Sequence, residues 1–132
     1  FVARYDGPVD KFYISFLDEA ERNSAYARVK PLPYYVTDAG FNDFEIMAPG
    51  VDKGAGLAQL AGLLGLRAAE VAAVGDSSND LPMLRWAGLA VAMGNASSAV
   101  RAAADVIVAD NEHGGMAEIL NRIAEGAFDN GH

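Results

Sequence analysis

The pattern of apolar and polar positions changes near residue 49 and divides the chain into two regions. In the first region, residues 11–17 are rich in aromatic and branched side chains and predict a strand, and residues 34–38 and 43–48 predict two more. The polar run at residues 18–30 predicts a helix, because its first turn is acidic and its last turn is basic. We therefore expect a small α+β unit with an antiparallel hairpin.

In the second region, alanine and leucine become frequent and predicted helices alternate with predicted strands. Residues 52–65 predict a helix, because leucines recur at helical spacing and Gly65 can end it. Trp86 and Met93 are expected in the core. The remaining strands are expected at 71–75, 89–94 and 105–110, and the remaining helices at 79–88, 96–104 and 114–126.

This alternation predicts an α/β fold, with an open, mostly parallel, Rossmann-like sheet and helices on both of its faces. The predicted domains are an α+β region over residues 1–48 and an α/β region over residues 49–132. Ligands of such sheets bind beyond the carboxyl ends of the strands. The loops that follow the predicted strands are therefore where functional residues are expected.

Composition restricts the possible classes of function. The 132 residues are 52% apolar and 21% charged, which is typical of a globular protein, and the absence of cysteine excludes a thiolate metal site and fits a reducing cytoplasm. The net charge of −8 would repel nucleic acid and anionic lipid. No apolar run is long enough to span a membrane. We expect a cytoplasmic protein without nucleic-acid or membrane partners, in which any phosphorylated ligand binds at a local site.

Two aspartates directly follow the predicted strand "VAAVG". Asp76 comes at its carboxyl end, and Asp80 begins the next predicted helix. Two carboxylates at this edge suit a hard cation such as Mg²⁺, which prefers oxygen ligands. The alternative is that Asp80 is a helix N-cap, which is the more common role of an aspartate in such a turn. The spacing of the pair leaves both hypotheses open.

Lys53 stands at the start of a predicted helix, where a positive charge opposes the helix dipole. A locally unfavourable charge can serve to neutralise phosphate, although a solvated surface lysine is the commoner case. In the later loops, Asn95 is interpreted as a helix cap, and Asp110 and Asn111 face the same edge as the aspartates. His113 is interpreted as an exposed loop residue, because no second histidine or cysteine lies at ligand spacing.

Three segments together resemble a known family. The segments "GVDKGAGLAQLAGLLGL", "VAAVGDSSNDLPMLRWAGLAVAMGNA" and "AADVIVADNEHGGMAEIL" are similar to the C-terminal half of the haloacid dehalogenase-like hydrolases, and specifically of the Cof-type phosphatases. Residues 11–48 are similar to the end of the α+β cap domain that this subfamily carries in its middle. The resemblance implies that residues 49–132 are the C-terminal part of the family's core domain.

The resemblance also implies roles for four residues. Lys53 matches the lysine that holds the phosphate, and Asn79 matches a residue that contacts it. Asp76 matches a direct Mg²⁺ ligand, and Asp80 matches its companion acid, which orients metal-bound water or Lys53. The implied catalytic residues are thus Lys53, Asp76 and Asp80, with Asp76 and Asp80 at the metal and Lys53 and Asn79 at the phosphate.

One part of the family pattern is missing. The family's nucleophile and its acid/base lie in an Asp-x-Asp motif, and no two aspartates of this sequence are separated by a single residue. The chain also begins with Phe1 rather than Met, which predicts a removed or omitted preceding segment. We expect the parent protein to be a Mg²⁺-dependent phosphatase of small phosphorylated metabolites such as sugar phosphates, and this chain alone to be inactive.

Three further expectations follow. The partner that we expect is the missing N-terminal portion or a second copy of the chain. The alternative functions are a non-catalytic phosphate- or cation-binding domain and a structural α/β domain in which the acids are only caps. A dinucleotide-binding role is disfavoured, because no Gly-x-Gly-x-x-Gly follows a predicted strand.

Overall fold

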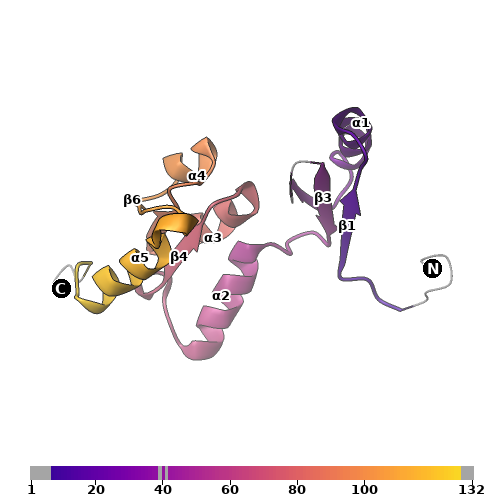
Figure 1. Ribbon diagram of the computed structural model, residues 1–132. Coiled ribbons are helices and arrows are strands. Elements are labelled where there is room, and N and C mark those ends of the chain that lie inside the picture. The colour runs from indigo at the N-terminus through magenta and orange to yellow at the C-terminus, as the bar shows by residue number, and fades with distance from the viewer. Residues whose placement is uncertain (1–6, 39, 41, 129–132) are drawn as a thin grey trace. The chain divides into compact units, whose positions relative to one another are not determined.

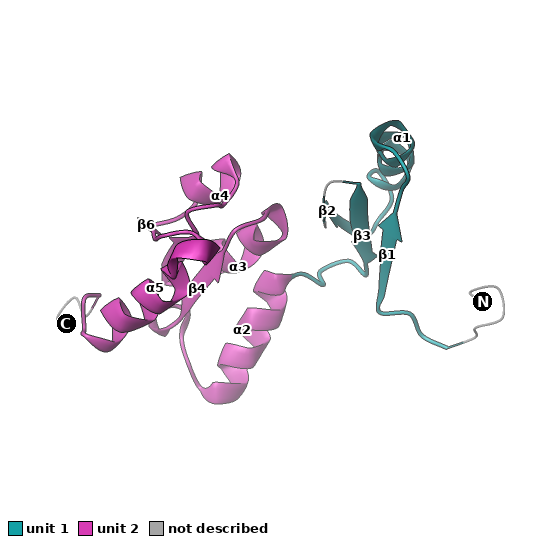
Figure 2. Cartoon of the chain, in the orientation of Figure 1, with its two compact units in different colours: residues 1–52 teal, residues 53–132 magenta. Residues whose placement is uncertain are grey.

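A computed structural model describes residues 7–38, 40 and 42–128 of the chain. The chain forms two compact units, residues 1–52 and residues 53–132, which Figure 2 colours separately. The segment between the strands predicted at 34–38 and 43–48 lies partly outside the described residues. Among the described residues, no helix has both the length and the apolar character needed to cross a bilayer.

The first unit is a three-stranded antiparallel sheet with one helix. Its elements are β1 (Lys11–Ser15), α1 (Glu19–Val29), β2 (Tyr35–Asp38) and β3 (Asp43–Met47), and the strand order is β1-β3-β2. The sequence-based prediction of a strand, a helix and an antiparallel hairpin is confirmed. Helix α1 begins after Asp18, whose side chain accepts a hydrogen bond from the Glu21 N–H at 2.8 Å.

Phe44 is the centre of the first unit's core. It is fully buried and lies against two other rings, Phe16 at 5.3 Å and Tyr26 of α1 at 5.6 Å between ring centroids. On the same side of the sheet, Arg22 of α1 makes an ion pair with Asp38 at the end of β2. Helix α1 is therefore fixed to one face of the sheet by both apolar and charged contacts.

The second unit is an α/β layer structure, as predicted. Its three strands are parallel in the order β4-β5-β6, and helices follow each strand (Figure 1). The helices and strands are α2 (Lys53–Leu64), β4 (Ala72–Gly75), α3 (Leu81–Trp86), β5 (Leu89–Ala92), α4 (Ser98–Ala102), β6 (Val106–Ile107) and α5 (Gly115–Ala124). Three short 3-10 turns complete the unit: η2 (Ala68–Glu70), η3 (Ser78–Asp80) and η4 (Asn111–His113).

The two faces of this sheet bury different helices. Alternate strand residues point to opposite faces, so Ala90 and Ala92 of β5 face one side and Val91 faces the other. The alanine side packs against α3 and α4, with Leu84 and Val100 fully buried. The valine side packs against α5 through residues that include Val91, Met93, Val108 and Ile119. Small residues on one face therefore allow helices to approach closely, and larger residues fill the space under the other helix.

The end of α2 agrees with the prediction, whereas β6 and the start of α3 differ from it. Gly65 ends α2 with φ +72°, as expected. The third strand is only two residues long, because the chain leaves the ladder after Ile107 and bends into η4. The helix expected from residue 79 begins instead as η3, and Pro82 stands in the first turn of α3, where its missing N–H is tolerated. Met93 is buried as expected, whereas Trp86 is only partly buried.

Two leucines on helices of the second unit provide a matched test of this core. Leu84→Ala removes a side chain that is 1% exposed and should lower the free energy of unfolding by about 3 kcal/mol. Leu63→Ala removes one that is 80% exposed and should change it by less than about 0.5 kcal/mol. Urea unfolding followed by the fluorescence of Trp86, the only tryptophan, measures both. Equal effects of the two variants would contradict this description of the core.

Candidate functional site

The carboxyl end of β4 turns directly into η3, and this tight turn forms the centre of the site. Gly75 is buried, and a Cβ placed there would lie 2.5 Å from the Cβ of Asp80. A larger residue therefore cannot occupy this position without displacing the aspartate. The absence of a side chain at Gly75 allows Asp80 to fold back over the end of the strand.

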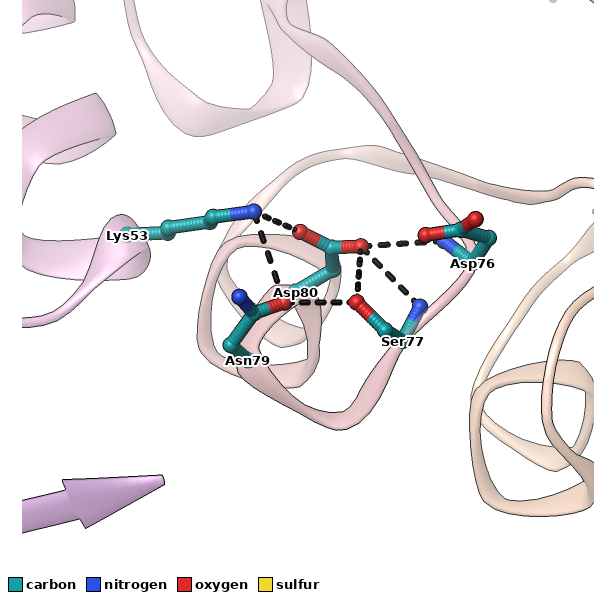
Figure 3. Close-up of polar contacts among 5 residues, drawn as sticks. All are labelled: Lys53, Asp76, Ser77, Asn79 and Asp80. Carbon is teal, nitrogen blue, oxygen red and sulfur yellow. Dashed lines mark hydrogen bonds and ion pairs between the residues drawn. The ribbon is translucent and has the colours of Figure 1, made fainter. Parts of the chain in front are cut away.

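Asp80 is a buried acid with its two oxygens directed at different partners. Its side chain is 5% exposed. Its Oδ2 atom accepts hydrogen bonds from the backbone N–H groups of Asp76 at 3.0 Å and Ser77 at 3.1 Å. Its Oδ1 atom accepts from the Lys53 ammonium group (Figure 3). Asp80 thus links the β4 turn to the start of α2.

These contacts decide the ionisation of Asp80. Burial by itself would raise the pKa of the Asp80 carboxyl, because the charged form loses hydration. The hydrogen bond from Lys53 and the two backbone N–H donors oppose this effect, and they hold the pKa below its usual value. The buried acid is therefore negatively charged at neutral pH.

Lys53 reaches Asp80 because α2 lies very close to α3. A Cβ at Gly54 would lie 2.6 Å from the Pro82 carbonyl oxygen, so only glycine permits this approach. The Lys53 side chain remains 50% exposed while its Nζ atom contacts Asp80. Glycine disfavours a helix by itself, but at position 54 it is required by this packing.

Asn79 joins the same network. Its side-chain oxygen accepts hydrogen bonds from the Ser77 hydroxyl at 2.7 Å and from Lys53 Nζ at 3.4 Å. Ser77, for which the sequence predicted no role, therefore contributes a hydrogen bond as well. The sequence signal that could have identified it is its place between the two predicted ligands, Asp76 and Asp80.

Asp76 lies on the other side of Asp80 from Lys53 (Figure 3). It is exposed, and its Oδ2 atom accepts a hydrogen bond from the Asn95 side-chain amide at 3.4 Å. Its backbone carbonyl accepts from the Ser97 N–H at 3.0 Å. The two predicted acids are therefore in different environments, one buried and bonded to lysine and one directed to solvent.

A single cavity of about 490 Å³ unites these residues. Lys53 and Asp76 both line it, together with Asp80, although no contact joins the lysine to Asp76 directly. The other lining residues are Val74, Gly75, Met83, Met93, Asn111, Gly114 and Met116. Charged groups of both signs thus face one space at the carboxyl end of the parallel sheet.

One interpretation of the later loops is wrong and others hold. Asn95 is not a helix cap, because the cap of α4 is Ser97, whose hydroxyl accepts from the Val100 N–H at 3.4 Å. His113 is exposed, as expected, and its Nδ1 atom lies 2.5 Å from Asp110 Oδ1. The sequence could not reveal the contacts of Asn95, because its partners lie in other loops.

Comparison with known proteins identifies the family. The model of the haloacid dehalogenase-like hydrolases matches residues 2–120, which is most of the chain. The chain belongs to this family. The resemblance that the sequence motifs indicated is therefore confirmed, and the parallel sheet with flanking helices is the family's fold.

Three similar proteins show how much of the family the chain spans. A uracil-derivative phosphatase from Bacillus subtilis, named 5-amino-6-(5-phospho-D-ribitylamino)uracil phosphatase YcsE, is 36% identical over 83% of this chain and 45% of its own length. A protein of Arabidopsis thaliana named chloroplastic endoribonuclease YBEY is 35% identical over 84% of this chain and 20% of its own length. A solved haloacid dehalogenase-like hydrolase from B. subtilis matches 92% of this chain and 44% of its own, with a TM-score of 0.84 and 28% identity. The chain thus spans between a fifth and about half the length of these proteins.

The residues of this chain fit a hard divalent cation in part. The Asp76 carboxylate is exposed at the cavity and offers oxygen, the donor that Mg²⁺ prefers. Both oxygens of Asp80 already accept hydrogen bonds from protein groups. Within the described ranges, no group of three or more His, Cys, Asp or Glu side chains could hold a metal ion. Of the two acids, Asp76 is therefore the one whose carboxylate is open to a cation.

Replacing Asp80 should change both stability and its dependence on pH. Asp80→Asn should lower the free energy of unfolding at neutral pH by about 2 kcal/mol, because an amide cannot accept from Lys53 and from both N–H groups as a carboxylate does. The folded pKa of Asp80 is below its unfolded value of about 3.9. Its stabilisation is therefore present above that value and is lost as the pH falls through the lower folded value.

Urea unfolding of the second unit at neutral pH and at about pH 3, followed by Trp86 fluorescence, measures this loss. The wild-type chain should lose more stability on acidification than Asp80→Asn does. Asp76→Asn is the matched control, because Asp76 is exposed in the same turn, and it should change stability by less than about 0.5 kcal/mol. The same acid dependence in wild type and Asp80→Asn would contradict the assigned charge of Asp80.

Proposed function

We propose that this chain carries part of the active site of a Mg²⁺-dependent phosphatase of the Cof-type branch, namely the part that contains Lys53. The whole enzyme is proposed to hydrolyse small phosphorylated metabolites. The observation that carries the proposal is the arrangement of Lys53 and Asp76 around one cavity on opposite sides of the buried Asp80. A cation and a phosphate group can be held side by side in such a cavity. Phosphoryl transfer depends on this kind of positioning and charge stabilisation.

In the proposed mechanism, Lys53 binds a phosphate oxygen. Its ammonium group is half-exposed at the cavity, and Asp80 holds it in place. The side-chain oxygen of Asn79 is already occupied by Ser77 and Lys53, so its NH₂ group is the part that can donate to a second phosphate oxygen. These donors match the charge that develops on the transferring group.

Asp76 is the proposed metal ligand of this chain. A bound Mg²⁺ would shield the negative charge of the phosphate from the groups that attack it. Asp80 is proposed to act beside it as the acid that orients Lys53, since both of its oxygens are already bonded to protein donors. A direct bond from Asp80 to the cation would require it to give up some of these donors.

The nucleophile is proposed to be an aspartate outside the printed sequence. Two observations support this: the sequence has no Asp-x-Asp pair, and Lys53 and Asp76 line one cavity in which such a group could act. Attack by its carboxylate oxygen on phosphorus would release the alcohol and leave an aspartyl phosphate, which water then hydrolyses to aspartate and phosphate. Residues 1–48, which make up most of the first unit, are proposed to be the last part of the family's cap domain.

The proposed substrate is a small phosphomonoester such as a sugar phosphate. The name of the B. subtilis relative, a phosphatase of a phosphoribityl compound, supports this class. An RNA substrate, which the name of the A. thaliana relative would suggest, is disfavoured because the net charge of −8 offers no general attraction for a polyanion.

The activity of two proteins tests this proposal. The purified 132-residue chain should not turn over a generic phosphomonoester. The reading frame upstream of Phe1 should encode a strand that ends in Asp-x-Asp, and the longer product should hydrolyse phosphomonoesters with Mg²⁺ and lose this activity on chelation. Robust turnover by the 132-residue chain would overturn the proposed division of the active site. An upstream frame without Asp-x-Asp would favour a non-catalytic binding domain.

Lys53 can be tested in the longer product. Lys53→Met should lower kcat/KM by about 10²- to 10³-fold, because a group that stabilises the transferring phosphate is lost. Lys30→Met is the matched control, since Lys30 is an exposed lysine of the first unit, and it should leave kcat/KM unchanged. Steady-state kinetics with a chromogenic phosphomonoester measures both, and equal rates for the two variants would exclude the assigned role of Lys53.

A further inference from the structure

Asn95 contacts two residues that line the cavity, Asp76 and Asn111. Its Nδ2 atom donates to Asp76 Oδ2 at 3.4 Å, and its Oδ1 atom accepts from the Asn111 N–H at 3.2 Å. A backbone N–H can only donate, and an ionised carboxylate can only accept. The orientation of the Asn95 amide is therefore dictated by its two partners.

The backbone around Asn95 is bonded to the same two segments. Ser97 N–H donates to the Asp76 carbonyl at 3.0 Å, and Gly94 N–H donates to the Ala109 carbonyl at 3.2 Å. A Cβ at Gly94 would lie 2.8 Å from the Asp110 nitrogen, so the two loops are in close contact there. The backbone is therefore held on both sides of Asn95, and this places the Asn95 side chain between the two loops.

The loop that receives this bridge is itself well fixed. Asp110 accepts from the His113 N–H at 2.9 Å and caps η4. A Cβ at Gly115 would lie 1.9 Å from the Ala109 carbonyl oxygen, so α5 begins tightly against the loop. Asn111 and Gly114 line the cavity. A rigid loop of this kind can hold the asparagine, and through it the carboxylate, in one place.

We propose that Asn95 is a positioning residue that holds one oxygen of the Asp76 carboxylate through its amide, so that the other oxygen is presented to the cation. This inference rests on the proposed function. An exposed carboxylate on a short side chain otherwise rotates, and fixing it on binding costs conformational entropy. Groups that orient a metal ligand by a hydrogen bond affect metal affinity although they do not touch the ion.

Nuclear magnetic resonance of the 132-residue chain, titrated with Mn²⁺ as the probe cation, tests this role. Paramagnetic broadening of the backbone amide signals of Asp76 and Ser77 measures the apparent affinity without any enzymatic activity. Asn95→Ala should weaken the affinity by about tenfold. The Asn111 amide signal should also shift in the metal-free variant, because its hydrogen-bond acceptor is gone. Asn95→Ser is a second variant in case alanine disturbs the turn, and it should show the same loss.

Asn121→Ala is the matched control. Asn121 is an exposed asparagine of α5 that does not line the cavity, and its variant should bind Mn²⁺ like the wild type. Equal affinity of wild type, Asn95→Ala and Asn95→Ser would overturn the role of Asn95 and leave the proposed function intact. By contrast, no broadening in the wild type, or unchanged broadening in Asp76→Asn, would overturn the cation site and the inference with it.

Discussion

The arrangement of the site depends on keeping one buried carboxylate ionised. Asp80 has almost no contact with solvent, and burial alone would favour its neutral form. The Lys53 ammonium group and two backbone N–H groups at the end of β4 supply the compensating donors. A buried charge without such partners would be strongly destabilising. The fold must therefore bring the start of α2 and the end of β4 to the same carboxylate.

Two glycines make this convergence possible. Gly54 lets the first turn of α2 touch the Pro82 carbonyl, and Gly75 leaves room for the Asp80 side chain. The close approach then places Lys53 at the cavity instead of leaving it on an open surface. A lysine at a helix start, which is unfavourable to the helix dipole, is thus stabilised by a specific partner. The same contact that stabilises the unit also orients the group proposed to bind phosphate.

The type and order of the elements were predictable because they depend on local patterns. Helical spacing of leucines and a glycine at position 65 were sufficient for α2 and its end. The proximity of Lys53 to Asp80 was expected from the family resemblance. By contrast, the bridge made by Asn95 joins three loops that are far apart in the sequence, and no local pattern encodes it. Its interpretation as a cap failed because Ser97, two residues later, offers the hydroxyl that α4 uses.

The charges of the site explain why a cation would be needed beside Lys53. The positive charge of Lys53 is already balanced by Asp80, with which it forms an ion pair. Asp76 adds a negative charge at the same cavity, and the chain as a whole carries −8. A phosphomonoester dianion would therefore be repelled by these residues alone. A divalent cation at Asp76 would reverse the local sign, so that the lysine and the cation attract the phosphate together. The two acids thus have complementary roles in the proposed site, since Asp80 faces inward to fix the lysine and Asp76 faces outward to the ion.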